Sequence, residues 1–184
     1  MSYESSVLAV PVSGKDHAQG YDGAVATLVE YGDFQCPACA AAHPMVQQIQ
    51  RHYAGNLNFV FRNFPLKQIH PLAELAAELA EGADSIGEYW KMHDWLFENQ
   101  QRWSAFGAAG LQEGMRELGI DEASIEKALS KPDIVDRIQK DYASGVQSGV
   151  SGTPNFFING RLYSPERHGS LARAIGHVIA KQPH

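Results

Sequence analysis

Two kinds of hydrophobic pattern divide this chain. Short apolar runs rich in β-branched and aromatic residues lie near its two ends, at 24–31, 57–64 and 156–163, and predict β-strands. Between about residues 66 and 149, apolar residues instead recur every three or four positions, which predicts a series of helices. A further apolar run from Val7 to Val12 is a candidate edge strand.

The strand at 24–31 leads through a short loop into a helical pattern from about 36 to 53, and the strand at 57–64 follows that helix. Pro44 lies inside the helix and is expected to kink it. In the last third of the chain, the dipeptide Asn159-Gly160 predicts a two-residue β-hairpin, and a final helix follows the hairpin. The predicted order is therefore β, β–α–β, a helical block, and β–β–α.

One sheet receives strands from both ends of the chain in this order, with the helical block inserted in the middle. We therefore predict an α/β fold with a discontinuous domain, residues 1–65 and 150–184, and an all-helical insertion at 66–149. Within the insertion, Asp121 is expected to cap one helix and Pro132 to open the last one.

Charge and composition narrow the possible functions. The formal net charge is -6 and no run of Lys and Arg occurs, which argues against nucleic-acid binding. No apolar stretch approaches the roughly 18 residues that a membrane span needs. The first residues lack the cationic start and the long apolar segment of a secretory signal peptide. We therefore expect a cytoplasmic protein, or a periplasmic one if the sequence is a processed form.

The cysteines carry the sharpest chemical information. The chain has two, Cys36 and Cys39, separated by two residues. A disulfide between them closes almost no loop, so it would add little stability by restricting the unfolded chain. A secreted protein held together by disulfides would need more cysteines, spread along the sequence. Reactivity therefore explains this pair better than stability does.

A Cys-x-x-Cys pair on the first turn of a helix suits thiol–disulfide exchange. Exchange needs a thiolate that attacks and a second thiol that resolves the mixed disulfide. Unpaired backbone N–H groups and the helix dipole stabilise an anion at this end of a helix. We therefore assign Cys36 as the nucleophile and Cys39 as the resolving thiol.

Two alternatives compete with this assignment. The pair could be half of a zinc site, for which His43 is the only nearby additional ligand, or it could be two inert core cysteines. Haem attachment is excluded because the residue after Cys39 is Ala40 and not His.

Other motifs accompany the cysteines. Glu30 lies six residues before Cys36, and Pro44 lies five residues after Cys39. The tripeptide Gly152-Thr153-Pro154 precedes a short apolar strand. Together with the strand, the Cys-x-x-Cys pair and the helix, these features resemble the thioredoxin superfamily.

More narrowly, three segments resemble the DsbA-type thiol–disulfide oxidoreductases: Tyr31–Cys39, Tyr89–Asn99 and Gly152–Gly160. The resemblance covers nearly everything from Asp16 onward. It implies a thioredoxin-like fold and a protein disulfide oxidoreductase, isomerase-like in class, that acts on protein or peptide thiols and disulfides. Glutathione or a thioredoxin-type protein is the implied redox partner. The disulfide of the cysteine pair is the implied redox group, with no separate cofactor.

The resemblance also implies roles for individual residues. Pro154 would form a cis peptide bond facing the cysteine pair, and the backbone of Thr153 would pair with an extended peptide. An ordinary trans proline is the alternative, since cis is the minority state of X–Pro bonds. Glu30 would be a buried acid beneath Cys39 that takes its proton, with a pKa raised towards neutrality by burial. A partly exposed glutamate on an edge strand is the alternative.

The residues between the cysteines, Pro37 and Ala38, are expected to contact the substrate. Strongly oxidising relatives carry a histidine where this chain has Ala38, and the charge of that histidine helps the thiolate. We therefore expect a less depressed pKa at Cys36, and a lower reduction potential, than in those oxidants.

Two functions of other kinds stay open at this level. A thioredoxin-like domain that only binds a peptide would use the same groove without reactive thiols. A glutathione-linked enzyme would use Cys36 on small molecules. No metal site is predicted, because His43 is interpreted as a packing or capping residue and His93 as part of the core of the insertion. Asp33 is a candidate to orient the loop before Cys36.

Overall fold

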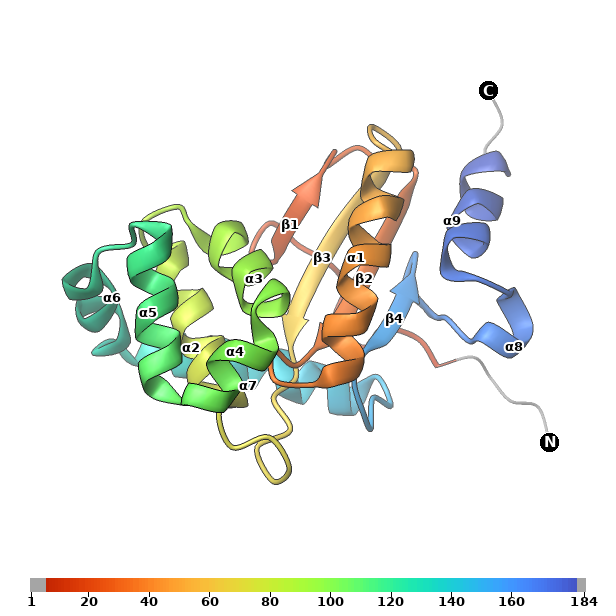
Figure 1. The fold of residues 1–184 in the computed structure, drawn as a ribbon. Coiled ribbons are helices and arrows are strands. Elements are labelled where there is room, and N and C mark those ends of the chain that lie inside the picture. Colours follow the sequence, from red (N-terminus) through yellow and green to blue (C-terminus); the bar gives the residue numbers. More distant parts are fainter. Residues whose placement is uncertain (1–5, 182–184) are drawn as a thin grey trace.

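The computed structural model describes residues 6–181, and its centre is a five-stranded sheet (Figure 1). In the sheet the strands follow the order β1-β3-β2-β4-β5, with β2 and β3 parallel and the other neighbouring pairs antiparallel. The central strand is therefore β2, and both ends of the chain supply strands, as the sequence predicts. The strands are β1 His17–Gly20, β2 Ala26–Gly32, β3 Leu57–Asn63, β4 Asn155–Ile158 and β5 Arg161–Leu162.

The predicted β–α–β unit consists of β2, the helix α1 Pro37–His52 and β3. Because β2 and β3 are parallel, α1 must run back along the sheet, and its N-terminus lies just after the end of β2. Both strands are almost entirely buried, which is typical of parallel strands covered on two sides. This unit brings the cysteine pair to one edge of the sheet.

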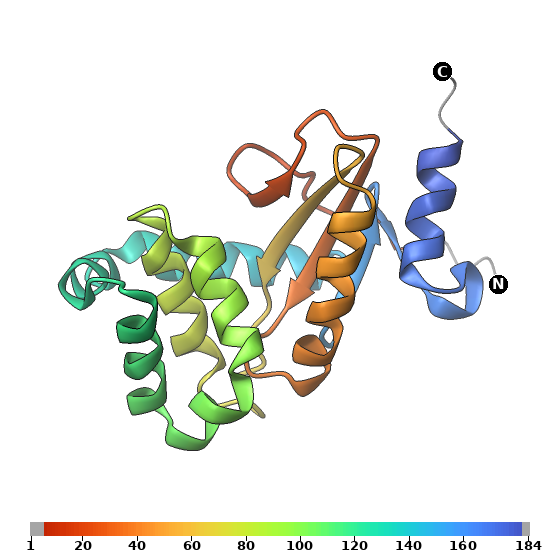
Figure 2. The same ribbon diagram turned by 45° about the horizontal axis from the view of Figure 1, so that its top comes forward.

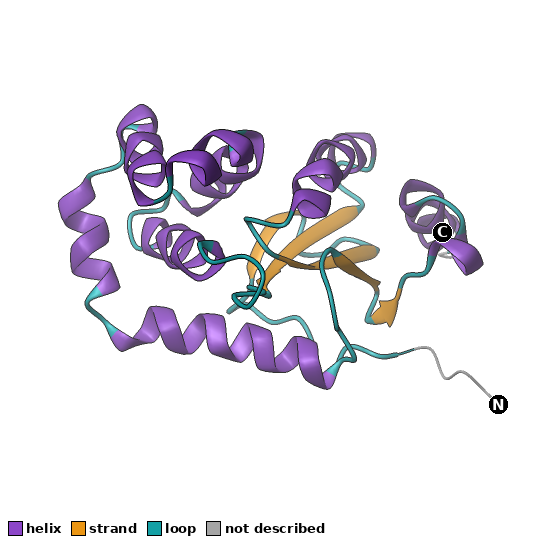
Figure 3. Cartoon of the chain, turned by 60° about the horizontal axis from the view of Figure 1, so that its bottom comes forward, coloured by secondary structure: helices purple, strands orange, loops and turns teal. Residues whose placement is uncertain are grey.

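Helices cover both faces of the sheet, which gives three layers (Figure 3). α1 and the last helix, α9 Leu171–Ala180, cover one face, and α7 Pro132–Gln147 covers the other. Successive residues of β2 point to opposite faces: Leu28 packs in the cluster with α1 and α9, whereas Tyr31 packs in the cluster on the α7 side. At Gly145, α7 approaches the sheet so closely that a Cβ atom would lie 2.7 Å from the Phe64 ring.

The helices between β3 and α7 pack beside the sheet (Figure 2), and they lie, together with α7, within the range 66–149 predicted to be helical. The Asp121 carboxylate accepts a hydrogen bond from the backbone N–H of Ser124 at 3.2 Å, which confirms it as a helix cap. Among residues 6–181, no helix is long and apolar enough to cross a membrane. The helices from β3 to α7 are α2 Ala73–Asp84, α3 Tyr89–Glu98, α4 Gln100–Phe106, α5 Ala108–Leu118 and α6 Glu122–Leu129.

The structure corrects the prediction at the sheet edge. Val7–Val12 is not the edge strand: Val7 forms only an isolated bridge with Arg161. Pro11 in this run has no backbone N–H to donate to a ladder. The edge strand is β1, whose residues after His17 are exposed and which therefore carries no hydrophobic run. The short helices α4 and α8 Pro165–His168 are also not predicted by the pattern.

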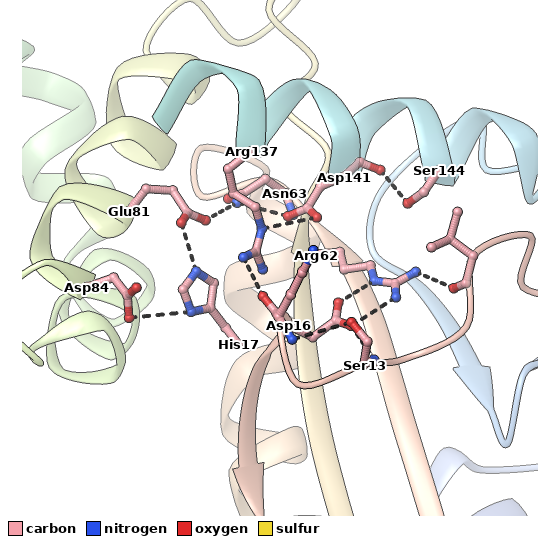
Figure 4. Close-up of polar contacts among 12 residues, drawn as sticks. Ser13, Asp16, His17, Arg62, Asn63, Glu81, Asp84, Arg137, Asp141 and Ser144 are labelled. Atoms are coloured by element: carbon pink, nitrogen blue, oxygen red, sulfur yellow. Dashed lines mark hydrogen bonds and ion pairs between the residues drawn. The ribbon is translucent and has the colours of Figure 1, made fainter. Parts of the chain in front are cut away.

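A buried network of charged and polar side chains joins the helical block to the β1 and β3 edge of the sheet (Figure 4). Arg62 on β3 pairs with Asp16 through two contacts, at 2.8 and 3.2 Å. Glu81 on α2 accepts hydrogen bonds from His17 at 2.8 Å and from Asn63 at 2.6 Å. We call this the junction network, and it consists of Asp16, His17, Arg62, Asn63, Glu81, Arg137 and Asp141.

Candidate active site

Cys36 lies between the end of β2 and the beginning of α1. It is the last residue with extended backbone before the helix, and Pro37 is the first residue of the helix. Cys39 lies one turn into α1, where its N–H donates to the carbonyl of Cys36 at 3.1 Å. Cys36 is 6% exposed and Cys39 is 0% exposed, and the two are free thiols. Cys36 is therefore the more accessible of the two thiols.

The environment separates the acidities of the two thiols. A hydrogen bond from the Cys39 side chain lowers the pKa of Cys36 to about 5, with smaller contributions from Thr153 and from backbone N–H groups, and against the effect of burial. Burial raises the pKa of Cys39, as do its hydrogen bond to Cys36 and the nearby Glu30. At neutral pH the outer sulfur is thus a thiolate and the inner one a thiol. This asymmetry would suit Cys36 as the nucleophile and Cys39 as the resolving thiol, and these roles stay predictions.

Glu30 lies on the central strand, on the face that α1 covers. The residue is 3% exposed. Burial, and after it the charge of Cys36, raise the pKa of the Glu30 carboxyl to about 8. Gly32 leaves space here, because a Cβ at that position would collide with the Phe61 ring and lie 3.4 Å from Oε1 of Glu30. The structure confirms a buried acid with a raised pKa, and the role of this acid in proton transfer stays a prediction.

The bond between Thr153 and Pro154 is cis, as predicted, and the trans alternative is wrong. Pro154 directly precedes β4, whose first residue pairs with Tyr31 near the end of β2. The Sγ atom of Cys36 lies 3.5 Å from the carbonyl oxygen of Thr153. The fold therefore brings the loop with Cys36 against the loop with Thr153 and Pro154. Cys36 and Pro154 are 118 residues apart in the sequence.

Three polar side chains hold the loop that carries Cys36. Asp33 is 1% exposed, and its carboxylate accepts hydrogen bonds from the N–H of Gln35 at 2.7 Å, from the N–H of Leu66 at 2.9 Å and from His70 at 2.7 Å. The predicted orienting role of Asp33 thus has a structural basis.

Gln35 and Gln100 complete this frame, and sequence reasoning missed both. Gln35 Oε1 accepts the N–H of Leu72 at 2.7 Å. Gln100, on α4, donates from Nε2 to the carbonyls of Phe34 and Cys36 at 2.8 and 2.9 Å. No short motif marks these glutamines, because their partners come from distant segments.

A cavity of about 510 Å³ opens beside the first turn of α1. Pro37 and Ala40 line it on one side, and Phe97, Gln100 and Arg102 line it on the side of the helical block. A larger cavity, of about 610 Å³, lies next to the junction network and away from the cysteines. We regard the smaller one as the relevant groove, because of the two it alone is lined by Pro37, the residue next to Cys36.

The chain is similar to proteins of one family. The family described as Thioredoxin matches residues 12–177. Among curated proteins, a Na⁺/H⁺ antiporter NhaA 1 from Salinispora arenicola is 39% identical over 164 residues. That match covers 89% of this chain but only 24% of the antiporter, so the chain spans about a quarter of that relative's length. The name antiporter describes the whole of that longer protein.

Solved structures show the same fold. The thiol-disulfide exchange protein alpha-DsbA2 from Wolbachia pipientis superposes with a TM-score of 0.78 at 17% identity, over 92% of this chain and 88% of that protein. BdbD from Bacillus subtilis in its oxidised form gives a TM-score of 0.77 at 24% identity, over 96% of this chain and 97% of that protein. At these identities the likeness establishes the architecture, and the chemistry rests on the residues described above.

Proposed function

Because this chain belongs to the thioredoxin family, and because its two thiols differ so strongly in acidity, we propose that it is a thiol–disulfide oxidoreductase that uses Cys36 and Cys39. The observation that carries the proposal is the placement of an acidic thiol, Cys36, at the start of α1, against the carbonyl of Thr153 before cis Pro154.

The first step is attack by the Cys36 thiolate on a substrate disulfide. One substrate sulfur forms a disulfide with Cys36, and the other leaves as a thiolate that takes a proton from water. The pKa of about 5 supports this step, because the attacking sulfur is ionised at neutral pH. Cys39, buried and protonated, cannot compete as the nucleophile.

The second step needs Cys39 to lose its proton. We propose that the Glu30 carboxylate takes it, directly or through water, and that the Cys39 sulfur then attacks Cys36. The charge of Cys36 contributes to the raised pKa of Glu30. That charge disappears once Cys36 is bound in a mixed disulfide, so the pKa of Glu30 should fall when a base is needed. The products are the Cys36–Cys39 disulfide and a reduced substrate, and the reverse sequence oxidises a dithiol.

The substrate backbone is proposed to lie in extended form beside Thr153, in a strand-addition mode of recognition. Pro37 and Ala38 would contact it at the start of α1. Ile69 supports a role for the neighbouring loop, since it is 68% exposed on a segment that Asp33 and Gln35 tie to the active-site loop. An exposed apolar side chain at this position suits contact with a nonpolar residue of an unfolded or flexible peptide.

Protein or peptide thiols are the proposed substrates, and glutathione or a thioredoxin-type protein is the proposed redox partner. Isomerase activity is a finer proposal, and scrambled disulfide substrates test it. The direction depends on the reduction potential of the couple relative to that of its compartment, which for a cytosolic glutathione pool lies near about -220 to -260 mV. A midpoint above that range would indicate an oxidant, and a midpoint below it a reductant.

The decisive experiment is a redox titration of the purified protein in glutathione buffers, with the thiol state read by mass spectrometry after acid quenching and alkylation. We expect one two-electron transition in which both cysteines are oxidised together. Unreactive thiols over the whole range would contradict the proposal. Persistent glutathione adducts on Cys36 without the internal disulfide would favour the glutathione-linked enzyme instead.

Two variants separate catalysis from binding. Cys36→Ser should abolish exchange, whereas Cys39→Ser should trap the mixed disulfide, because the resolving thiol is missing. A peptide-binding module would retain its affinity when both cysteines are replaced and would show no exchange in the intact protein. The combination of bound peptide and absent exchange would overturn the proposed enzyme.

A further inference from the structure

A histidine one turn beyond Cys39 has a ring nitrogen without a hydrogen-bond partner in the described part of the chain. His43 lies on the buried face of α1, is 5% exposed, and its Nε2 atom makes no hydrogen bond within residues 6–181. The nearest acceptors are Oδ1 of Asp94 at 3.7 Å and Oε1 of Glu98 at 3.9 Å. Both distances are too long for a hydrogen bond. They are close to the spacing of about 3.3 to 3.5 Å between two ligands of one tetrahedral zinc ion.

A second buried histidine faces the same place. His93 on α3 is 2% exposed, and its Nδ1 lies 2.8 Å from Oδ1 of Asp94. Its Nε2 likewise has no partner in the described part of the chain. One ligand atom from each of His43, His93 and Asp94 can be chosen so that all three lie within 4.8 Å of one another. We call these residues, with Glu98, the α1–α3 cluster.

Packing alone does not account for this arrangement. The sequence predicts packing roles for both histidines, and their rings do contact Phe97, with centroids 5.2 and 5.1 Å away. A buried histidine that only packs usually has its ring nitrogens hydrogen-bonded. Here Nε2 of each histidine lacks a hydrogen-bond partner among the described residues, and ligand atoms of both histidines lie close to the Asp94 carboxylate.

The cluster is also open to entry from solvent. The side chain of Asp94 is 37% exposed and that of Glu98 is 56% exposed, while the histidines lie beneath them. Asp94 borders a hollow of about 410 Å³ next to α1, and Glu98 borders the cavity beside Pro37. An ion could therefore reach the buried nitrogens past two carboxylates, which would attract a cation.

We propose that the α1–α3 cluster binds a divalent transition-metal ion, zinc in the first place, through a ring nitrogen each of His43 and His93 and carboxylate oxygens of Asp94 and Glu98. Imidazole and carboxylate together suit zinc, copper and nickel, whereas magnesium and calcium prefer oxygen alone. Such an ion fastens α1, which carries Cys39, to α3 of the insertion. It does not involve the thiols, so it stands apart from the proposed redox function.

The test uses the Cys36→Ser/Cys39→Ser protein, in which the thiols cannot bind metal. Titration calorimetry with zinc chloride should show one saturable site, and cobalt chloride should give the visible absorption of a low-symmetry Co²⁺ site. Magnesium chloride should not bind there. Thermal melting should shift upward with zinc, since an ion that binds the folded state stabilises it.

Matched variants locate the site. His43→Ala should weaken zinc binding by at least about 100-fold, because loss of even an outer-shell partner of a metal ligand costs about 10- to 100-fold. Asp94→Asn, at a partly exposed position that tolerates the change, should weaken it at least about tenfold. His52→Ala removes an exposed histidine of the same helix and should leave the affinity unchanged.

Three results would overturn the proposal. These are the absence of saturable zinc binding, zinc affinity unchanged in both His43→Ala and Asp94→Asn, and magnesium binding as tight as zinc binding. If His43→Ala unfolds, the Asp94→Asn and Glu98→Gln proteins decide alone. Exchange activity of the cysteine-intact protein is measured separately, so failure of the metal site leaves the redox proposal standing.

Discussion

Two buried acids in this molecule show what partners do to a carboxyl group. Glu30 lies beneath the cysteine pair, and its pKa rises from 4.5 to about 8, because burial and the charge of Cys36 act in the same direction. Asp141 lies in the junction network, and burial raises its pKa from 3.8 only to about 6, because Arg137 and the N–H of Asn63 offset much of the penalty. Glu30, the carboxyl next to the reactive thiols, has no such cation or N–H donor among the described residues to offset its burial.

The difference suggests how the two regions divide their tasks. Hydrogen bonds and opposite charges hold the junction network in one arrangement, and we infer a structural task for it. Glu30 has no compensating cation among the described residues, so its proton is free to leave or return when the charge on Cys36 changes. Changes in the first region should therefore act on stability, and changes in the second on exchange.

Arg62→Met should give the largest effect. Arg62 contacts Asp16, Tyr31 and two backbone carbonyls, and its loss leaves a buried carboxylate without its cation. We expect urea denaturation to show a loss of about 3–5 kcal/mol in the free energy of unfolding. The reduction potential of the folded protein should not change. Arg167→Met, at an exposed arginine, is the control, and a shifted potential in Arg62→Met would break the division of tasks.

Glu30→Gln should slow exchange without unfolding the protein. The amide fits the same space but cannot accept the Cys39 proton, and a general base contributes at least about 100-fold to such a step. The rate at which the mixed disulfide is resolved should therefore fall by about 100-fold at neutral pH. Rapid acid quenching measures this rate. Glu166→Gln changes an exposed glutamate and should have the wild-type rate. An unchanged rate in Glu30→Gln would remove Glu30 from the mechanism.

The pH dependence of stability should report Glu30 directly. In the unfolded chain this carboxyl is ionised above about pH 5, whereas in the folded protein it stays protonated until about pH 8. The unfolded state therefore binds fewer protons than the folded state, and the free energy of unfolding of the protein falls as the pH rises. Relative to Glu30→Gln, the wild-type protein should lose about 2 kcal/mol between pH 6 and 8.

This comparison is best made on the reduced proteins, because the charge of the Cys36 thiolate contributes to the raised pKa of Glu30 and is absent from the disulfide. In the reduced protein the pKa of Cys36 is lowered to about 5, so its own linkage raises stability as the pH rises, but this contribution is common to both proteins and cancels in the difference. Titration of Asp141 is common to both proteins and cancels in the difference. Parallel curves for the wild type and Glu30→Gln would show that Glu30 is not protonated in the folded state.

Ala38→His should give the smallest effect. A protonated histidine between the cysteines adds a charge that favours the Cys36 thiolate, which stabilises the reduced form. A decrease of one unit in the pKa of Cys36 corresponds to a rise of about 30 mV in the reduction potential, and we expect a shift of this order. Gln48→His, at an exposed position of α1, should leave the potential unchanged. An unchanged reduction potential in Ala38→His would contradict the expectation that the missing histidine lowers the potential of this protein relative to strongly oxidising relatives.

The sequence predicts those features that short segments determine. The Cys-x-x-Cys pair, the buried strand and the Asn159-Gly160 turn follow from local residue chemistry, whereas the burial of Glu30 and the cis bond at Pro154 are implied by the family resemblance. The structure places all of them as expected. What the sequence does not predict depends on distant contacts. Gln100 is an ordinary polar residue until the fold brings it within 2.9 Å of the Cys36 carbonyl.

The edge strand and the α1–α3 cluster cannot be predicted from the sequence for the same reason. β1 has no hydrophobic pattern, and only its pairing with β3 makes it a strand. His43 and His93 stand on the buried faces of two different helices, where a packing role is the natural expectation. Only the packing of α1 against α3 shows that their nitrogens face one carboxylate.

The contact of Gln100 with the Cys36 carbonyl has a consequence for protein engineering. The thioredoxin-like part of the chain and the helical block look like exchangeable modules, and a designer would be tempted to graft a block of different specificity onto this sheet. The frame of the reactive loop, however, is divided between the two modules, since α4 supplies one of its hydrogen-bond donors. A chimera that keeps the cysteines but loses the glutamine would inherit the nucleophile without the support that aims it.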